Sequence, residues 1–357
     1  MIKDVSVLGF RNFKRKRFIF SPKTTIIVGP NASGKTNILE ALYLLSTGKS
    51  FKARLTEEMI NYDKEIARAK AQVVSGINPE AVLTRGEINL GTTRQEKVPK
   101  KRLLLNGIGK RMFNFAGQFR TVLFGPWDLE LVTESPSIRR NFLDKVISQV
   151  DREYARAILS YEKGLRRRNR ILYRIREEGL SRSNLLFWSK LLIKNGDYVS
   201  RRRQDFIEFI NETPSLNEQE FKVDYEKSAI SAGRLEQYRS EEVAAATTLV
   251  GPHRDDIVIR IKSSNSGYKN WRDLARYGSR GEQRMGVLWL KLAELAFIKT
   301  ETGENPTLLL DDIFSELDKE HRKVVMKVVN NQQTIITTAT VHFIKGYLKQ
   351  FDRINLD

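Results

Sequence analysis

The stretch GPNASGKT, residues 29–36, constrains the fold of this chain more tightly than any other part of the sequence. It follows the apolar run TTIIV and precedes NILEALYLL, so an expected strand leads through a glycine-bearing turn into an expected helix. The stretch fits the pattern G-x-x-x-x-G-K-[ST], with Gly29, Gly34, Lys35 and Thr36 in the fixed positions. Such a turn cradles phosphate oxygens on its backbone N–H groups, at the positive end of the following helix. We therefore expect an α/β P-loop fold that binds a nucleotide.

The side chains of this turn have separate expected roles. Lys35 is expected to reach the β- and γ-phosphates of ATP, and the Thr36 hydroxyl is expected to ligate Mg²⁺. The ATP-binding residues expected in the turn and the start of the helix are Gly29, Asn31, Gly34, Lys35, Thr36 and Asn37. The alternative, a glycine-rich turn with an exposed lysine, explains fewer of these positions.

A second motif, PTLLLDDIFSELD at residues 306–318, reads as an apolar strand that ends in two carboxylates. In P-loop NTPases the first of them, Asp311, would hold Mg²⁺. The second, Asp312, could polarise the attacking water, so Asp312 and Lys35 are the catalytic candidates. Asp318 lies beyond a short turn, where it could shape the site or contact a partner subunit. The alternative is an ordinary acidic first turn of a helix.

A third motif, GSRGEQR at residues 278–284, precedes a long amphipathic helix. Small and donor-rich residues at a helix N-terminus can bind an anion. The same residues also read as a capping box with Ser279 at the cap and Glu282 three positions later. Taken alone, this motif favours the cap.

The formal charge of +19 indicates a polyanionic partner, either nucleic acid or an anionic membrane surface. The sequence has no cysteine, which excludes a disulfide scaffold and a thiolate metal site. No apolar run approaches the length of a membrane span, and the start lacks the apolar segment of a signal peptide. These features favour a cytoplasmic protein that binds nucleic acid and does not associate with a membrane.

Hydrophobic periodicity divides the chain into three segments. Residues 1–125 read as short strands, with a type I′ hairpin turn at Asn106-Gly107. Apolar residues then recur at helical spacing in two sets, from Tyr154 to Ile175 and from Leu185 to Phe209, which predicts an antiparallel helical hairpin that ends before Pro214. We expect a first part of an ATPase lobe at 1–125, a mainly helical inserted lobe at 126–244 and a second part of the ATPase lobe at 245–357.

The expected helical hairpin is the first candidate for DNA contact, because its helices carry runs of arginine. Contacts of this type would reach the phosphate backbone rather than read bases. A solvated helix face is the alternative, and cations of the ATPase lobe compete for the same role. The hairpin candidates are Arg166, Arg167, Arg168, Arg201, Arg202 and Arg203, and the competing residues are Lys100, Lys101, Arg102, Lys110 and Arg111.

The three motifs occur in the order that is typical of ABC-type ATPases, and SRGEQ resembles the signature turn of that superfamily. The resemblance implies a mixed-sheet ATPase lobe and a head-to-tail homodimer formed with ATP. Each nucleotide would lie between the P-loop of one subunit and the signature turn of the other. The residues acting in trans would be Ser279, Arg280, Gly281, Glu282 and Gln283.

Within that superfamily the chain resembles the RecF family of bacterial recombination mediators over nearly its whole length. The resemblance rests on GFRNFKR, GPNASGKTNILEALYLLSTGKSFK, GPWDLELVTESPSIRRNFLD, LVGPHRDDIVI, YGSRGEQR and LLLDDIFSELD. It implies an ATP-dependent protein that binds DNA, as double strands or at gap junctions. With RecO and RecR it would help to load RecA, and slow ATP hydrolysis would reset it.

The resemblance also points to further site residues, with two departures. Arg11 resembles a family arginine that reaches the nucleotide, and Gln118 is the candidate for the glutamine that senses Mg²⁺; a surface arginine and a plain loop glutamine are the alternatives. The usual switch histidine is missing, because TIITTAT ends in Thr337, Thr338 and Thr340. One threonine could replace it, whereas His342 is expected on the surface.

Two other functions share these motifs. An ABC transporter subunit would need a compact helical subdomain, and the interval between Lys35 and Ser279 is too long for one. A clamp of the SMC type would fill that interval with hundreds of heptad residues, and each helical set here lasts only three or four heptads.

Overall fold

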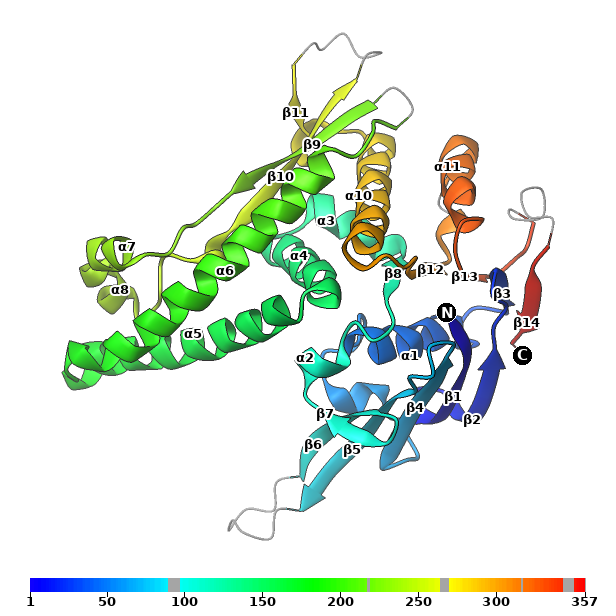
Figure 1. The fold of residues 1–357 in the computed structure, drawn as a ribbon, viewed down its shortest axis with the longest axis horizontal. Helices are drawn as coiled ribbons and strands as arrows, with labels where there is room; N and C mark the ends of the chain where they lie inside the picture. The colour runs from blue at the N-terminus through cyan, green and yellow to red at the C-terminus, as the bar shows by residue number, and fades with distance from the viewer. Residues whose placement is uncertain (89–96, 217–218, 264–269, 316, 343–349, 357) are drawn as a thin grey trace. The chain divides into compact units, whose positions relative to one another are not determined.

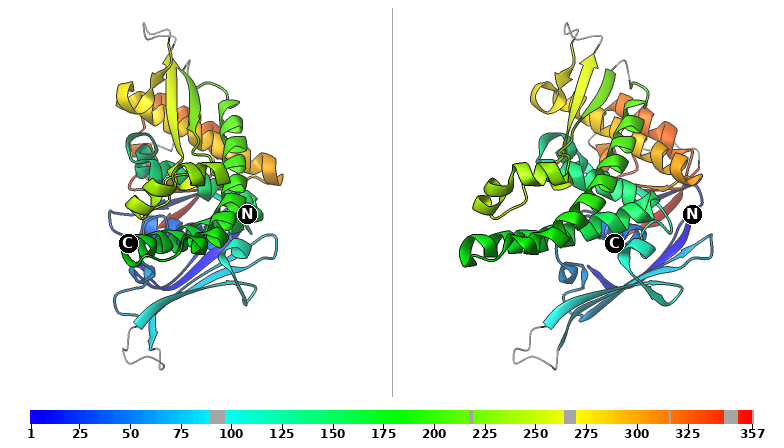
Figure 2. Two further views of the ribbon diagram at one scale, coloured as in Figure 1. Left: turned by 90° about the vertical axis from the view of Figure 1, so that its left-hand side faces the viewer. Right: turned by 60° about the vertical axis from the view of Figure 1, so that its left-hand side comes forward.

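The computed structural model describes residues 1–88, 97–216, 219–263, 270–315, 317–342 and 350–356. The chain forms two compact units, which are drawn as ribbons in Figures 1 and 2. The first unit comprises Met1–Asp128 and Ile298–Asp357, and the second comprises Leu129–Phe297. The first unit combines one antiparallel and one parallel sheet, and the second is mostly helical, so the expected α/β class is confirmed.

The first unit contains a six-stranded antiparallel sheet in the order β2-β1-β4-β5-β6-β7. Its strands are β1 (Ile2–Phe10), β2 (Phe13–Ile19), β4 (Ile66–Val73), β5 (Pro79–Ile88), β6 (Lys97–Leu105) and β7 (Ile108–Lys110). The turn between β6 and β7 is Asn106-Gly107, with φ of 51° and 80°, so the type I′ hairpin prediction is confirmed. The last two residues of the expected strand AVLTRGEINL lie outside the described residues.

The second sheet of this unit has five parallel strands in the order β14-β3-β13-β12-β8. These strands are β3 (Thr24–Val28), β8 (Thr121–Phe124), β12 (Thr307–Asp311), β13 (Thr334–Thr338) and β14 (Asp352–Asn355). The four strands other than β14 are buried at every residue, as expected for a parallel sheet covered on both faces. The carboxyl ends of β3, β12 and β13 meet at one edge, which positions the candidate site.

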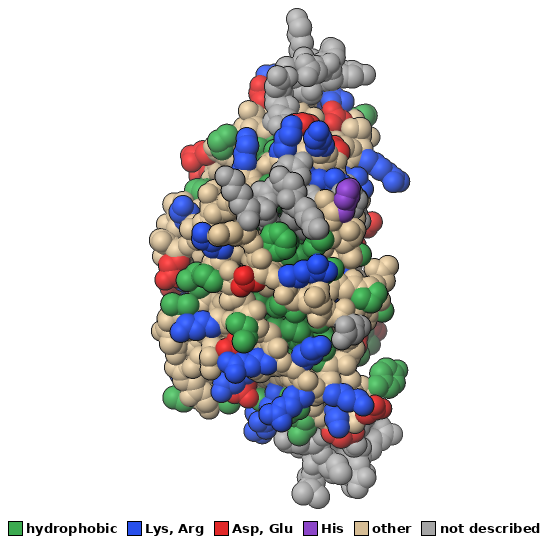
Figure 3. Space-filling model, turned by 90° about the vertical axis from the view of Figure 1, so that its right-hand side faces the viewer, with side chains coloured by type: hydrophobic (Ala, Val, Ile, Leu, Met, Phe, Trp, Pro, Cys, Tyr) green, Lys and Arg blue, Asp and Glu red, His purple; other side chains and the backbone are tan. Residues whose placement is uncertain are grey.

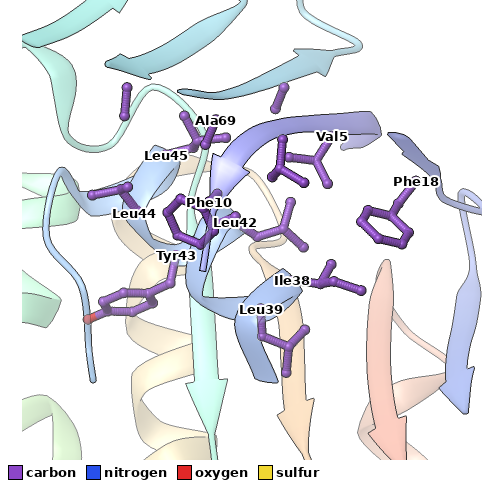
Figure 4. Packing of buried hydrophobic residues seen from close by; sticks show 14 of the residues in the cluster. Val5, Phe10, Phe18, Ile38, Leu39, Leu42, Tyr43, Leu44, Leu45 and Ala69 are labelled. Carbon is purple, nitrogen blue, oxygen red and sulfur yellow. The ribbon is translucent and has the colours of Figure 1, made fainter. Parts of the chain in front are cut away.

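Helix α1 (Lys35–Thr47) packs against strands of both sheets, and almost every residue of the helix is therefore buried. Figure 4 shows Ile38, Leu42 and Leu45 of α1 with Val5 of β1 and Ala69 of β4 in one apolar cluster. Since the P-loop leads directly into α1, this packing fixes the position of the loop. The remaining elements of the unit are α2 (Met112–Phe115), α11 (Lys319–Val329), and the 3-10 helices Thr56–Met59, Pro126–Leu129 and Ile313–Ser315.

The second unit is built on two long helices, α5 (Arg152–Glu178) and α6 (Leu186–Asn211), which pack against each other. Arg203 contacts Tyr154 at one end of the pair and Arg168 contacts Ser189 at the other, so the helices are antiparallel. The predicted hairpin, ending before Pro214, is therefore confirmed. None of the helices in the described part of the chain is long and apolar enough to cross a membrane.

Shorter elements complete the second unit. They are α3 (Glu130–Thr133), α4 (Pro136–Val150), α7 (Ala232–Gln237), α8 (Arg239–Ala245), α9 (Leu274–Tyr277), the 3-10 helices Arg182–Leu185 and Pro252–Arg254, and the strands β9 (Gln219–Glu226), β10 (Asp256–Ser263) and β11 (Arg272–Asp273). Helix α10 (Arg280–Thr302) begins in the second unit, and its residues from Ile298 onward belong to the first.

The structure divides the chain differently from the expected 1–125, 126–244 and 245–357. Residues 245–297 belong to the second unit, and the chain returns to the first unit only at Ile298. The reason is strand pairing: β10 forms an eight-residue antiparallel ladder with β9, which follows the helical hairpin. The apolar run DIVIRI lies in the segment that was expected to belong to the ATPase lobe, but it is the central strand of a separate three-stranded sheet, β11-β10-β9.

Candidate nucleotide-binding site

The P-loop lies between β3 and α1, as the sequence predicts. Two of its residues have left-handed backbone, Ala32 with φ of 67° and Gly34 with φ of 104°. A Cβ added at Gly34 would lie 2.6 Å from the side-chain amide nitrogen of Asn12, so a larger residue does not fit there. The Nζ atom of Lys35 donates hydrogen bonds to the carbonyl oxygens of Gly29 and Pro30, at 2.7 and 2.8 Å. The lysine charge is thereby held inside the curl of the loop.

The donor set of the loop fits a phosphate group. The Ser33 hydroxyl is buried and has no hydrogen-bond partner among the described residues, which is uncommon for a buried polar atom. Asn31 and Ala32 are exposed at the mouth of the loop, and α1 begins at Lys35. A buried hydroxyl, a lysine charge and a helix N-terminus together suit an anionic ligand such as the phosphates of ATP.

Thr36 and Asp311 lie side by side, as the two motifs predicted for a shared magnesium site. The Thr36 hydroxyl donates to a carboxylate oxygen of Asp311 at 3.1 Å. Thr337 on β13 donates to the same oxygen at 2.5 Å. Burial raises the pKa of Asp311, and the hydrogen bonds from Thr337 and Thr36 oppose that shift. Oxygen atoms of this kind are the ligands that Mg²⁺ prefers, so these residues fit the ion.

Asp312 has an unusual backbone, with φ of 48° in the left-handed region. Its N–H donates to both the carbonyl oxygen and the hydroxyl of Thr337, at 3.1 and 3.2 Å, so β13 holds this strained conformation. Burial raises the pKa of Asp312, while the charge of Lys35 and a hydrogen bond from the Ala339 N–H lower it. The two adjacent carboxylates therefore have different hydrogen-bond partners: Asp311 accepts from the Thr36 hydroxyl, and Asp312 accepts from the Ala339 N–H.

The tip of the β1–β2 hairpin also reaches the P-loop. Phe10 pairs with Phe13, which leaves Arg11 and Asn12 as the two tip residues. The Asn12 amide donates to the Ser33 carbonyl at 3.0 Å and accepts from the Asn37 amide at 2.9 Å. Asn12 thus links the P-loop to α1 through hydrogen bonds. The three motifs did not predict this role, because Asn12 lies outside all of them. Its position as a polar residue between two phenylalanines is the signal that could have identified it.

Arg11 is held by a carboxylate of α1. Its guanidinium forms a bidentate pair with Glu40, at 2.6 and 2.7 Å, and also contacts the Glu58 carbonyl oxygen. The Glu40 side chain is fully buried, so Arg11 neutralises a buried charge of α1 itself. This contact gives Arg11 a structural role; its reach toward a nucleotide stays a prediction.

The other expected residues of the first unit lie as follows. The Gln118 amide donates to the Asn114 carbonyl within its own turn. Thr338 donates to the Thr340 carbonyl, and His342 is exposed. Among the threonines of the last core strand, Thr337 is therefore the one that contacts the carboxylates. Asp318 caps α11, accepting from the N–H groups of Glu320 and His321.

The turn GSRGEQR lies in the second unit. It forms the capping box that this motif, taken alone, predicts. The Ser279 N–H donates to the Glu282 carboxylate at 2.7 Å, and the Glu282 N–H donates to the Ser279 hydroxyl at 3.3 Å. Glu282 also pairs with Arg272 at 2.9 Å. Gln283 is buried and bonds the carbonyls of α9, whereas Arg280 and Gly281 are exposed. The cap leaves the outer surface of the turn open for the expected contact in trans.

The structure removes Arg168 and Arg203 from the candidates for DNA contact. Arg168 is 3% exposed and pairs with the buried Glu242 at 2.6 Å. Arg203 is 1% exposed and pairs with Asp144 and Asp255, at 2.9 and 2.8 Å. Both guanidiniums face carboxylates inside the unit, because the runs of arginine extend around each helix and one residue in each run points inward.

The other hairpin arginines divide by exposure. Arg166 and Arg167 are exposed on α5. Arg201 is exposed and pairs with Asp197, and Arg202 is half-buried and pairs with Asp151 and Asp205. Of the competing cations, Lys101 donates to the Gly48 carbonyl, whereas Lys100, Arg102, Lys110 and Arg111 are exposed.

Comparisons with known proteins identify the family. The family described as RecF/RecN/SMC N terminal domain matches residues 1–355. The DNA replication and repair protein RecF of Herpetosiphon aurantiacus is 34% identical, over 100% of this chain and 98% of its own length. The RecF protein of Thermoanaerobacter pseudethanolicus is 35% identical, over 97% of this chain and 96% of its own length.

Solved structures agree with the sequence relatives. The structure of the recombination mediator protein RecF-ATPrS in the RecFOR pathway matches with a TM-score of 0.84 and 30% identity, over 100% of this chain and 97% of that one. The RecF-ATP structure matches with a TM-score of 0.82 and 32% identity, over 95% of this chain and 92% of that one. An SMC head bound to a winged-helix domain of ScpA matches in fold alone, with a TM-score of 0.52 and 16% identity. From the motifs, the site geometry and these full-length matches, the chain belongs to the RecF family of SMC-like, ATP-binding P-loop proteins.

Proposed function

We propose that this chain is an ATP-dependent DNA-binding protein of recombinational repair, and that ATP closes two copies head to tail on gapped DNA. In this proposal it acts in the cytoplasm with RecO and RecR to help load RecA, and slow ATP hydrolysis resets it. The observation that carries the proposal is the meeting of the P-loop, Asp311 and Asp312 at one edge of the parallel sheet. The names of the relatives, DNA replication and repair proteins, support the cellular role.

The chain's own residues suggest how ATP would be held. When bound, ATP with Mg²⁺ would supply the phosphoanhydride bond whose hydrolysis releases energy. Lys35 holds a positive charge within the loop, and the Ser33 hydroxyl offers a further donor. Thr36 and Asp311 present adjacent oxygens to a divalent cation.

Asp312 is the candidate for orienting water. Burial raises the pKa of Asp312, which makes it a better proton acceptor near neutral pH than an exposed aspartate. Its backbone is fixed by two hydrogen bonds to Thr337, so the carboxylate has a defined direction. Thr337 contacts both Asp311 and the Asp312 N–H, and it is the threonine we propose in place of the switch histidine.

The signature turn would complete the site of a second copy. The Ser279 hydroxyl and the backbone of Gly281 stand at the exposed N-terminus of α10, a helix of 23 residues. A helix N-terminus attracts an anion, so this turn suits the γ-phosphate of a nucleotide held by another subunit. The capping box fixes the turn before any partner arrives, which lowers the conformational cost of closure.

Sedimentation velocity with and without ATP tests the proposal. We expect a monomer without nucleotide, a dimer with ATP, and a slower-dissociating dimer when a gapped duplex is added. The Ser279→Arg variant should still bind ATP but stay monomeric, because its bulk and charge block closure over the nucleotide.

Three results would each oppose part of the proposal. A dimer that forms equally without ATP would remove the nucleotide gate. A Ser279→Arg protein that dimerises as readily as wild type would show that the turn is only a cap. Failure of the wild-type dimer to bind gapped DNA would favour the alternatives, an SMC-like clamp subunit or a transporter ATPase.

A further inference from the structure

The six-stranded antiparallel sheet has an apolar face and a charged face. On β4, Ala67, Ala69 and Ala71 are buried against the core, whereas Arg68 and Lys70 are exposed on the opposite side. This alternation is the period of two that a strand imposes on its side chains. Lys and Arg side chains are spread over the face drawn in Figure 3, with Asp and Glu among them, so surface charge alone does not single out a binding surface. The register of the strands does single out one surface, because it shows which cations lie in the same row.

One row across the charged face carries an arginine on every second strand. Arg15 on β2 lies opposite Leu8 on β1, and Leu8 lies opposite Arg68 on β4. Arg68 lies opposite Val82 on β5, which lies opposite Arg102 on β6. Neighbouring strands are about 4.8 Å apart, so successive arginines are about 10 Å apart and the row spans about 19 Å. The row contains no carboxylate.

The two adjoining rows carry further cations, and carboxylates neutralise part of their positive charge. In the next row Arg17 and Lys70 occupy β2 and β4, and Glu80 lies opposite Lys70. Arg17 pairs with Asp4 at 2.9 Å, although 58% of its side chain is exposed. On the other side Lys100 lies opposite Thr84. We call this surface the cationic sheet face; its members are Arg15, Arg17, Arg68, Lys70, Lys100 and Arg102.

We propose that the cationic sheet face binds the sugar–phosphate backbone of duplex DNA. This inference rests on the proposed function, since it assigns a surface to the DNA that the function requires. An arginine fork matches a phosphate group with two parallel hydrogen bonds. A row of about 19 Å is long enough to reach phosphates on both sides of either groove of the duplex.

The composition of the face favours a duplex over single strands. Phe10 and Phe13, at the β1–β2 end of the row of Lys100, are buried, and none of the exposed described residues in these three rows is aromatic. Proteins that bind single strands stack bases on aromatic side chains. The small polar side chains Ser6 and Thr84 between the cations suit phosphate and sugar oxygens. The face offers no groove-reading helix, so binding should be independent of base sequence.

The test compares two doubly substituted proteins that lose the same charge. Arg15→Gln/Arg68→Gln removes two exposed cations of the row, neither of which forms an ion pair with a described residue. Lys299→Gln/Lys319→Gln removes two exposed cations of the same unit away from the sheet. Binding of each full-length protein to a fluorescein-labelled duplex is measured by anisotropy with ATP, over a series of salt concentrations.

We expect the sheet variant to bind duplex at least about tenfold more weakly at ~0.1 M salt, with a log–log salt slope shallower by about two. The control variant should keep the wild-type slope. Arg15→Lys/Arg68→Lys should recover most of the affinity, because the charges return; this recovery separates lost contacts from misfolding.

Equal slopes for the sheet variant and wild type would overturn the inference while leaving the proposed function intact. A loss of binding to vesicles rich in anionic lipid, without a loss of duplex binding, would overturn it in favour of a membrane surface. A loss confined to single strands would also overturn it. If wild-type protein with ATP binds no duplex at all, the proposed function fails and the inference fails with it.

Discussion

Arg168 was a candidate for DNA contact by sequence and is a buried ion-pair residue in the structure, and this difference predicts a large effect on folding. Its guanidinium bonds Glu242 at 2.6 Å, Thr248 at 2.8 Å and Ser189 at 3.2 Å. Glu242 is 1% exposed, and its other oxygen accepts from the Leu249 N–H at 3.0 Å. Substituting Arg168 by methionine would keep the aliphatic volume and leave the Glu242 charge with one backbone donor.

The expected cost follows from that burial. Removing one partner of a buried ion pair lowers the free energy of unfolding by about 3–5 kcal/mol, because the other charge stays buried without compensation. Domains of ordinary stability unfold at a cost of about 5–15 kcal/mol, so the second unit would lose a large fraction of its stability. Removing both charges is often close to neutral, so Arg168→Met/Glu242→Leu should recover most of the loss.

Urea unfolding followed by far-ultraviolet circular dichroism measures the effect. Arg167→Met is the matched control, since Arg167 is the adjacent residue and is exposed. It should change the free energy of unfolding by less than about 0.5 kcal/mol. If Arg168→Met were no more destabilising than Arg167→Met, the buried pair would not hold the second unit together. The residue would then return to the list of DNA contacts.

The remaining predictions concern the site and the pH dependence of stability. Lys35→Ala should weaken ATP binding severely in a folded protein, and near-normal affinity by calorimetry would refute the phosphate-binding assignment. Asp312→Asn should keep ATP affinity but lose most turnover and accumulate a dimer on sedimentation; wild-type turnover would exclude Asp312 as the water-orienting group. Burial lowers the pKa of His253 to about 4. The unfolded histidine therefore binds a proton first as the pH falls from about 6.5 to about 4, and stability should drop by about 3 kcal/mol across that range. Urea titrations should show a smaller drop for His253→Gln, and an identical drop would contradict this assignment.

Much of the fold was predictable because local chemistry dictates it. The P-loop has an αL backbone at Gly34, the β6–β7 turn is Asn-Gly, and the helical hairpin follows from apolar spacing. Thr36 and Asp311, which the motifs assign to one magnesium site, lie within hydrogen-bond distance because Asp311 ends β12, Thr36 follows the loop after β3, and the carboxyl ends of these strands lie at one edge of the parallel sheet. In each of these cases the deciding residues are neighbours in the sequence or belong to motifs of fixed spacing.

The parts that could not be predicted depend on partners distant in the sequence. The inward direction of Arg168 depends on Glu242, which lies 74 residues later. The role of Asn12 depends on the hairpin tip meeting the P-loop, 21 residues away along the chain. The apolar strand at 256–263 could have joined either sheet, and its pairing with β9 placed it in the second unit. Periodicity specifies that such residues are buried, but not what they contact.

The order of the parallel sheet has a consequence for the synthesis of the protein. The strand that leads into the P-loop, β3, lies between β13 and β14, which are both translated after the whole of the second unit. The N–H of Leu356 donates to the carbonyl oxygen of Val28, one residue before the loop. Ile2 likewise bonds the side chain of Gln333, 331 residues later. The second unit, by contrast, is continuous in sequence and can fold as soon as it has emerged. A nascent chain therefore completes the parallel sheet around the P-loop only after the second unit has been translated, and a ribosome-stalled product that ends before β13 would carry the second unit without that sheet.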